Sequence, residues 1–360
     1  MTGRENFKRA IEFKGPAYLP VRFGLGEESQ ELKEKDEAKL QRIKELRSQF
    51  DEKKDIVEFW CSDIWNDIRT KDGIKYWEDE WGVGWADNGS GGRVITSPLK
   101  GGYHLLDSYK FPDPNMHAIV HKQYIEDRMR ISKERYRLAT VWFTLFERMW
   151  SLCGFNNMLM APYLDTENFL RLRDKVMEFN LAKIDEWLKR GADGIFFSDD
   201  WGSQTALFID PNDWRKFYKP AYKKMFERVR AGGAHVWLHS DGNIIAILPD
   251  LIEVGLNVLN PVQPQAMDVR LLSREFGGKC CFDGGVDAQG TLVFGTPDDI
   301  RREVYELTGL FGRFGGGYIG GTSHVIMTET PIDNVIALYE AFLEIQNKYK
   351  KLGGGELLSL

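Results

Sequence analysis

The second half of the chain repeats one pattern, in which a short apolar run ends in polar residues and an amphipathic helix follows. The clearest runs lie at residues 194–197, 235–238, 256–259, 279–282 and 317–319. Short apolar strands that alternate with helices predict a parallel sheet covered by helices. An open sheet concentrates its site at one switch point, whereas the mouth of a (β/α)8 barrel collects side chains from all its strands. Because nearly every run here ends in polar groups, we predict a (β/α)8 TIM barrel.

The first hundred residues follow a different pattern. A short helix is expected at 6–13, and residues 28–54 are dense in Glu and Lys with apolar residues at helical spacing, which is typical of a solvated helical region. Residues 74–85 and 93–98 alternate in the manner of strands, and Gly89–Gly92 lies between them, which predicts a β-hairpin. We therefore predict one domain over residues 1–350, with an N-terminal helical and β-hairpin elaboration at 1–105, a barrel core at 106–350 and a flexible tail at 351–360.

Composition excludes several classes of function. The chain of 360 residues has a net charge of -6 and no Lys/Arg tract with interleaved aromatic residues, so nucleic acid is not an expected partner. No apolar stretch of about 20 residues is present, and the start MTGRENFKRAIEF has no apolar signal core, so we expect a cytoplasmic protein without a membrane span. None of the 4 cysteines forms a CxxC pair, which disfavours a thiolate metal site.

The polar residues that follow the apolar runs are the candidates for chemistry. They are Glu147, Asp199, Asp200, His239, Asp241, Asn260, Gln263, Asp283, Asp287, Thr322, Ser323 and His324. On an extended segment His239 and Asp241 face the same way, because they are two residues apart. Together with His324 they have the donor types of a zinc site with a position open for substrate. An acid/base set is an equal alternative, in which Asp241 or Asp199 tunes His239. For Asp287 and Ser323, a cap or turn role is expected.

Several of these segments resemble the uroporphyrinogen decarboxylase superfamily. The similarity covers roughly residues 110–348 and implies a (β/α)8 barrel. The segments that carry it are Gly191-Ala192-Asp193-Gly194, Ser198-Asp199-Asp200-Trp201-Gly202, His239-Ser240-Asp241-Gly242, Asn260-Pro261-Val262-Gln263, Phe282-Asp283-Gly284-Gly285-Val286-Asp287 and Gly316-Gly317-Tyr318-Ile319.

The N-terminal region separates the two activities that this resemblance implies. True decarboxylases of the superfamily carry an arginine-rich segment, resembling M-R-Q-A-G-R, that binds the carboxylates of a tetrapyrrole. Such cations are needed because buried carboxylates must be paired. The matching region here, Leu19–Gly26, has the single cation Arg22 and is followed by Glu27 and Glu28. The sequence therefore favours the second branch, the cobalamin-dependent methyltransferases.

The resemblance to that branch also implies a metal site. These methyltransferases bind zinc through a His-x-Cys pair and a later Cys. His239 matches the histidine, Asp241 takes the position of the first Cys, and His324 lies at or beside the second. A His/Asp/His set would hold a harder, more Lewis-acidic metal, which favours polarising an ether oxygen over activating a thiol. This predicts a methoxylated aromatic methyl donor (O-demethylation). The replacements equally allow that the metal site is lost.

The sequence therefore predicts a corrinoid-dependent methyltransferase that moves a methyl group between a small substrate and a corrinoid protein, with Zn²⁺ in the barrel and cobalamin supplied by that partner. The predicted catalytic residues are Glu147, Asp199, His239 and Asp241. The predicted substrate- or corrin-binding residues are Asp200, Trp201, Asn260, Gln263, Asp283 and Thr322. Two alternatives stay open. One is a metal-free decarboxylase in which Asp199 or Asp283 holds pyrrole N–H groups, and the other is a barrel that merely binds a corrinoid or porphyrin.

Overall fold

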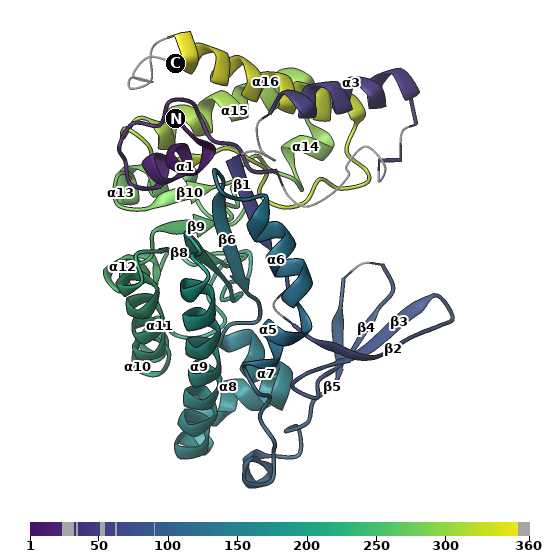
Figure 1. The fold of residues 1–360 in the computed structure, drawn as a ribbon, viewed down its shortest axis with the longest axis vertical. Coiled ribbons are helices and arrows are strands. Elements are labelled where there is room, and N and C mark those ends of the chain that lie inside the picture. Colours follow the sequence, from purple (N-terminus) through teal and green to yellow (C-terminus); the bar gives the residue numbers. More distant parts are fainter. Residues whose placement is uncertain (24–31, 34, 51–54, 62, 90, 352–360) are drawn as a thin grey trace.

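The main sheet of the protein is parallel and curls into a barrel (Figure 1). The structure is a computed structural model that describes residues 1–23, 32–33, 35–50, 55–61, 63–89 and 91–351. Within these residues seven strands form the sheet, and each neighbouring pair is parallel. In sheet order they are Ile56–Phe59 (β1), Tyr136–Val141 (β6), Gly194–Ser198 (β7), His235–His239 (β8), Val258–Asn260 (β9), Cys281–Asp283 (β10) and Tyr318–Ile319 (β11).

An eighth position beside β11 is taken by the segment 19–23. Val21 forms a parallel bridge with Gly320. The N–H of Arg22 donates to the carbonyl of Gly320 (2.7 Å), whose own N–H donates to the carbonyl of Pro20 (2.9 Å). Pro20 has no N–H, so it cannot donate to a regular ladder. The TIM-barrel-like fold is thus confirmed. It differs from the predicted (β/α)8 barrel in its eighth position, where a one-residue bridge replaces a regular strand.

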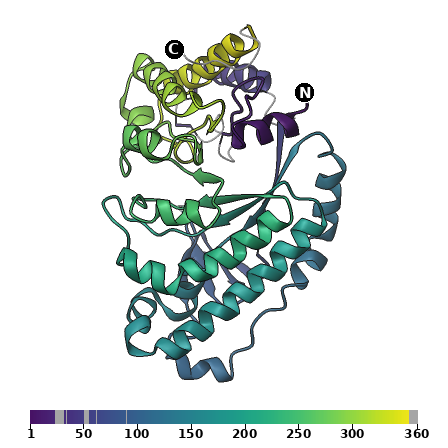
Figure 2. The ribbon, with the colours of Figure 1, turned by 90° about the vertical axis from the view of Figure 1, so that its left-hand side faces the viewer.

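Helices cover the outside of the sheet. In Figure 2 the long helices α9 and α11 run side by side across the face of the barrel that is turned toward the viewer. The helices from β6 onward are Phe146–Cys153 (α7), Phe155–Leu164 (α8), Thr166–Lys189 (α9), Pro211–Phe217 (α10), Lys219–Ala231 (α11), Leu248–Glu253 (α12), Val269–Phe276 (α13), Thr291–Phe294 (α14), Pro297–Gly312 (α15) and Ile332–Lys351 (α16). None of the described helices is long and apolar enough to cross a membrane.

The N-terminal helix closes one end of the barrel. Helix α1 (Gly3–Ile11) begins earlier than predicted because Thr2 and Glu5 form a capping box. Its Phe7 and Ile11 join an apolar cluster with side chains from the interior of the strands, and the ring of Phe7 stacks on Tyr136 at 5.6 Å. With this end filled, the carboxyl ends of the strands form the open mouth.

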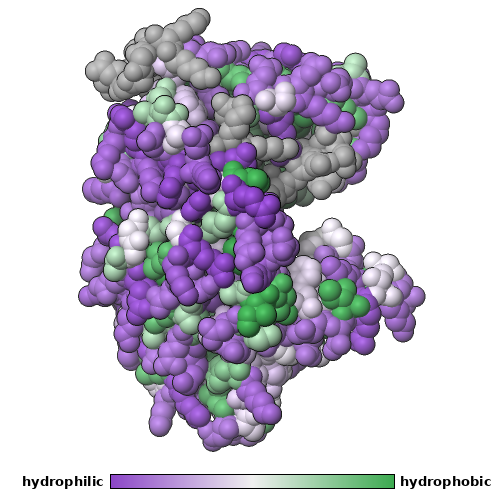
Figure 3. Space-filling view, in the orientation of Figure 1, coloured by the Kyte–Doolittle hydropathy of each residue, from purple (hydrophilic) through white to green (hydrophobic). Residues whose placement is uncertain are grey.

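The predicted hairpin is part of a larger antiparallel sheet, which stands out from the body in Figures 1 and 3. Its strands are Trp65–Lys71 (β2), Ile74–Asp79 (β3), Gly84–Asp87 (β4) and Arg93–Thr96 (β5). The run predicted as one strand over 74–85 is two strands, because the Asp79 side chain accepts hydrogen bonds from the N–H groups of Trp81 and Val83 (both 3.0 Å) and turns the chain. We call this unit the β2–β5 sheet.

The remaining N-terminal elements support the barrel. Helix α3 (Glu37–Gln49) lies inside the predicted helical region, and its Lys39 and Arg42 pair with Asp333 and Glu340 on α16. Residues 28–31, 34 and 51–54 of that region, and 352–360 of the predicted tail, lie outside the described residues. Two parts of the parallel sheet, β1 and the segment 19–23, lie within residues 1–105. From the sequence these residues are predicted to form the N-terminal elaboration and not the barrel core. The connection to β6 contains Tyr103–Asp107 (η1), Met116–Val120 (α5) and Lys122–Arg130 (α6).

Candidate active site

A cavity of about 340 Å³ lies at the carboxyl ends of the barrel strands. Since the strands are parallel, their carboxyl ends meet at one end of the barrel, where enzymes of this architecture have their active sites. Its wall contains the residues at or just after the strand ends and one from the eighth position, namely Trp60, Trp142, Ser198, Asp200, His239, Asp241, Asn260, Pro261, Asp283, Thr322, Ser323, His324 and Arg22. The structure thus brings most of the predicted polar set together.

His239 is held in one orientation by a chain of hydrogen bonds behind it. Its Nδ1 lies 2.7 Å from Oδ1 of Asn260, and the Asn260 amide donates from Nδ2 to Asp283 (2.7 Å). Arg22 donates to the same carboxylate oxygen (2.8 Å). An ionised Asp283 can only accept, so Asn260 turns its NH2 toward Asp283 and its oxygen toward His239. Nδ1 of His239 therefore carries a proton, and Nε2 is the nitrogen that can take up a further proton or a cation.

Two carboxylates face that acceptor nitrogen. Nε2 of His239 lies 3.8 Å from Oδ1 of Asp200 and 3.9 Å from Oδ1 of Asp241. One donor atom from each of the three residues lies within 4.8 Å of the other two. An unprotonated nitrogen and two carboxylate oxygens repel one another unless a proton or a cation lies between them. Imidazole nitrogen and carboxylate oxygen are also ligands of zinc and similar divalent ions. The trio therefore fits a divalent cation.

The two carboxylates are themselves positioned by neighbours. Gln263 donates from Nε2 to Asp241 (2.8 Å) and accepts from the N–H of Gly242 (2.7 Å). The N–H of Asp241 donates to Oδ1 of Asp200 (2.9 Å). Burial raises the pKa of Asp241, and the nearby His239 lowers it in part. Gln263 thus positions Asp241 and is not among the residues that line the cavity, although the sequence assigned it to substrate binding.

His324, the third predicted metal ligand, lies in the cavity wall but outside the trio. It is exposed, and among the described residues the close group of donors contains Asp200 in its place. Sheet order explains the difference, because Asp200 follows β7, which pairs directly with β8, whereas β11 is three strands away from β8. The hydroxyl of Thr322 donates a hydrogen bond to the carbonyl of His324 (2.6 Å), so the two residues are linked within the loop that follows β11.

Two predicted site residues lie behind the wall. Asp199 is fully buried and accepts hydrogen bonds from the N–H groups of residues 145, 146 and 147 and from the hydroxyl of Tyr222. It therefore stabilises the first turn of α7. Burial raises the pKa of Asp199 to about 7, against the lowering effect of these hydrogen bonds. Trp201 is also fully buried and donates from Nε1 to Tyr222 (2.8 Å).

Glu147, on the first turn of α7, does reach the cavity. Its carboxyl is buried, and Ser198 donates to it from Oγ (3.4 Å). Burial raises its pKa well above the ordinary value, and the neighbouring Asp200 and Asp199 raise it further. The raised pKa favours the protonated form of this carboxyl, which can donate a hydrogen bond to a bound oxygen.

Sequence reasoning missed the residues that complete the wall. The side chain of Arg22 is only 10% exposed and pairs with Glu58 at 2.6 Å as well as with Asp283. The indoles of Trp60 and Trp142 meet at 5.5 Å, and Trp142 stacks on His239 at 6.2 Å. No periodic signal marked these positions, because Trp60 follows a strand that was not predicted and Trp142 lies at the end of an apolar run.

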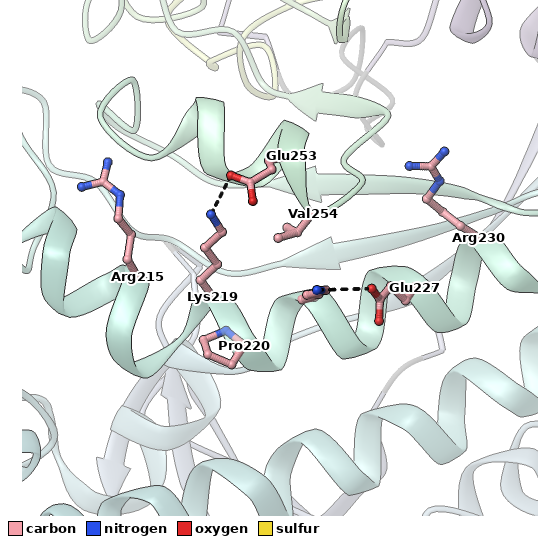
Figure 4. A pocket seen from close by; sticks show the side chains of 8 residues that line it. Arg215, Lys219, Pro220, Glu227, Arg230, Glu253 and Val254 are labelled. Atoms are coloured by element: carbon pink, nitrogen blue, oxygen red, sulfur yellow. Dashed lines mark hydrogen bonds and ion pairs between the residues drawn. The ribbon is translucent and has the colours of Figure 1, made fainter.

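A second hollow lies on the outer surface of the barrel helices, between α10, α11 and α12 (Figure 4). Most of its charged side chains pair with one another or with Asp250. Lys219 contacts both Glu253 (2.8 Å) and Asp250 (2.7 Å), and Lys223 lies 3.8 Å from Glu227. It is remote from the strand ends and lacks the trio of donors, so the cavity at the mouth is the candidate active site.

Comparison with known proteins places the chain among known families. Uroporphyrinogen decarboxylases from several bacteria are similar to it at low identity. That of Chlorobium phaeobacteroides is 24% identical over 241 residues, which span 63% of this chain and 66% of that protein. That of Actinobacillus succinogenes is 21% identical over 300 residues (76% and 77%), and that of Thermus thermophilus is 27% identical over 177 residues (49% and 48%).

A solved structure shares the fold. A methyltransferase from Methanosarcina mazei superposes with a TM-score of 0.67 at 16% sequence identity, and the alignment covers 96% of this chain and 99% of the other. The family model for uroporphyrinogen decarboxylase (URO-D) matches residues 138–345, which hold β6 to β11 and the donor trio. This match covers more than half of the chain, which therefore belongs to the uroporphyrinogen decarboxylase family.

Proposed function

We propose that this protein is a metal-assisted methyltransferase that moves a methyl group from a methoxylated aromatic compound to a corrinoid held by a partner protein. The observation that carries the proposal is the donor trio. Nε2 of His239 lies 3.8 Å and 3.9 Å from the oxygens of Asp200 and Asp241, while Nδ1 is committed to Asn260. A zinc ion held by His239, Asp200 and Asp241 would act as a Lewis acid toward the ether oxygen of the donor.

The charges of the cavity support a small substrate over a polycarboxylated macrocycle. Among the described residues that line it, Arg22 is the one Arg or Lys, and its guanidinium is already paired with Glu58 and Asp283. Asp200, Asp241 and Glu147 add acidic groups to the same wall. A substrate with many carboxylates would be buried there without partners, which is strongly unfavourable.

The remaining wall residues fit the handling of an ether. The rings of Trp142 and Phe196 lie against His239, and Trp60 lies beside both, so the wall next to the trio is apolar and suits a methyl group. In the transfer the O–CH₃ bond breaks, its electron pair stays on oxygen, and the methyl group passes to the reduced corrinoid of the partner. The phenolate that remains takes up a proton, which the protonated Glu147 is placed to supply.

The test combines metal content with transfer. Protein purified without chelator is expected to hold zinc in a ratio of one per chain and to demethylate dimethoxybenzene in the presence of a reduced corrinoid protein, followed by the change in corrinoid absorbance. His239→Ala is expected to lose both the zinc and the transfer. Absence of bound metal at neutral pH, or transfer that persists in chelator-treated protein, would contradict the proposal.

One observation favours decarboxylation as a second candidate. Oδ1 of Asp283 is buried in the cavity wall, and no described residue donates a hydrogen bond to it. Burial also raises the pKa of this carboxyl to about 6. Such an oxygen suits an N–H donor of a ligand, including a pyrrole. Incubation with uroporphyrinogen separates the candidates, since release of CO₂ by the metal-free protein would favour the decarboxylase.

A further inference from the structure

A larger cavity of about 590 Å³ lies between the barrel mouth and the β2–β5 sheet, and we call it the tryptophan chamber. Half of its lining residues carry aromatic rings. These are Trp60, Trp65, Trp77, Trp85, Trp142 and Phe143. The size falls in the range of small-molecule sites, and the aromatic wall is typical of them.

The chamber and the candidate active site share a wall. Trp60 and Trp142 line both cavities, and their rings meet at 5.5 Å. Trp142 stacks on His239 at 6.2 Å with 28° between the ring planes. A group bound against the shared wall in the chamber is therefore one indole away from the donor trio. Trp60 is fixed in this wall, because its Nε1 donates to Glu58 at 2.5 Å.

The charges around the chamber exclude an anion as its ligand. Its described lining contains the carboxylates Asp63, Asp79 and Asp87 and has no Lys or Arg. Arg148, which is buried behind the wall, is 2.6 Å from Asp79 and 3.5 Å from Asp63, so its charge is already matched. A carboxylate-bearing ring would be desolvated beside three carboxylates, and the described lining offers it no Arg or Lys side chain.

The indole faces also disfavour an organic cation. Nζ of Lys75 lies 4.6 Å from the ring centre of Trp65 and 5.6 Å from that of Trp77. Lys75 is also opposite Asp87 in the register of β3 and β4. A second cation on the same rings would be repelled by this ammonium, whereas an uncharged ring gains the stacking without that cost.

We propose that the tryptophan chamber is the entry site that first binds the uncharged aromatic ring of the methyl donor, beside the active site with which it shares Trp60 and Trp142. The inference rests on the proposed function and narrows its substrate class to methoxylated aromatics without a carboxylate. Asp63 and His121 supply polar groups in the chamber for a ring hydroxyl.

The test measures binding by calorimetry without corrinoid protein, so that it does not depend on transfer. Dimethoxybenzene is expected to bind roughly tenfold or more tightly than dimethoxybenzoate. Trp65→Ala is expected to weaken the binding of dimethoxybenzene about tenfold, because one aromatic contact is lost. Trp65 is 48% exposed, so this variant should fold, which its melting temperature checks. Ile68→Ala, on the same strand and 57% exposed, is the matched control and should bind as the parent does.

Three results would overturn the inference. They are tighter binding of dimethoxybenzoate than of dimethoxybenzene, tighter binding of tetramethylammonium than of dimethoxybenzene, and unchanged binding in Trp65→Ala. Failure of the proposed function gives a different pattern. In that case dimethoxybenzene binds and Trp65→Ala weakens it, but no methyl group reaches the corrinoid. Conversely, Trp65→Ala could transfer methyl groups normally and with an unchanged KM. That result would support the proposed function and show that the chamber takes no part in it.

Discussion

Nδ1 of His239 lies 2.7 Å from Oδ1 of Asn260, and the register of β8 and β9 places the two residues directly opposite each other. This contact selects the tautomer in which Nε2 accepts, and Asn260 is in turn oriented by Asp283 (2.7 Å). Asn260 therefore acts behind the proposed metal site, where outer hydrogen bonds orient a ligand and raise its basicity.

Asn260→Ala is expected to weaken zinc binding 10- to 100-fold while the chain stays folded, because His239 loses the acceptor that fixes its ring. A zinc titration with a competing chelator measures this. Asn212→Ala, on the exposed start of α10, is the control and should bind zinc as the parent does. Equal affinities in all three proteins would show that Asn260 does not orient a ligand.

Removal of single donors separates the metal set predicted from sequence from the trio that the structure brings together. Asp200→Asn is expected to reduce zinc affinity by roughly a factor of ten or more, whereas His324→Ala should change it by less than about threefold, since His324 lies outside the trio. The same chelator competition reports both variants. A larger loss of zinc affinity in His324→Ala than in Asp200→Asn would show that His324 is a ligand and Asp200 is not.

The buried pairing of Arg22 is expected to stabilise the barrel closure. Arg22→Met leaves Glu58 and Asp283 buried without their cation, so the free energy of unfolding should fall by about 3–5 kcal/mol. Arg270→Met removes the exposed pair with Glu306 and should cost about 1 kcal/mol or less. Urea denaturation of both variants tests the contrast, and similar losses would show that the burial of Arg22 adds nothing.

Glu303 on α15 is expected to give the fold a pH dependence away from the active site. Burial raises the pKa of its carboxyl from an ordinary value of 4.5 to about 7, and Oε2 has no partner among the described residues. Below pH 4.5 the carboxyl is protonated in the folded and unfolded chain and has no effect. Between pH 4.5 and about pH 7 the unfolded chain releases this proton while the folded chain still holds it, so the free energy of unfolding falls as the pH rises. Above this range both states are ionised and the free energy falls no further.

Glu303→Gln removes this ionisation. Relative to the parent, the variant is expected to gain about 1–3 kcal/mol in the free energy of unfolding between pH 5 and pH 8. Urea denaturation at the two pH values measures the difference. A stability difference between parent and variant that does not change with pH would show that Glu303 titrates normally.

The barrel was predictable because local patterns encode it. Short apolar runs such as 235–238 and the helices between them have periods that a sequence displays directly, and the polar residues after each run follow from the common direction of parallel strands. The prediction that His239 and Asp241 point the same way needed only the two-residue repeat of a strand. The turn at Glu80–Val83 was missed because no Pro marks it. The chain bends there because the Asp79 carboxylate accepts hydrogen bonds from two backbone N–H groups.

The composition of the site depends on contacts between distant segments. Sheet order made Asp200 a neighbour of His239 and left His324 at the edge of the cavity, although all three follow strands. Burial turned Asp199 into a cap for α7, and the eighth barrel position brought Arg22 to Asp283, 261 residues away in sequence. The periodic pattern of the chain thus specifies the strands and the end at which their side chains collect. The pairing order and packing of those strands select which donors come within reach of one another, because neither is a local property of the sequence.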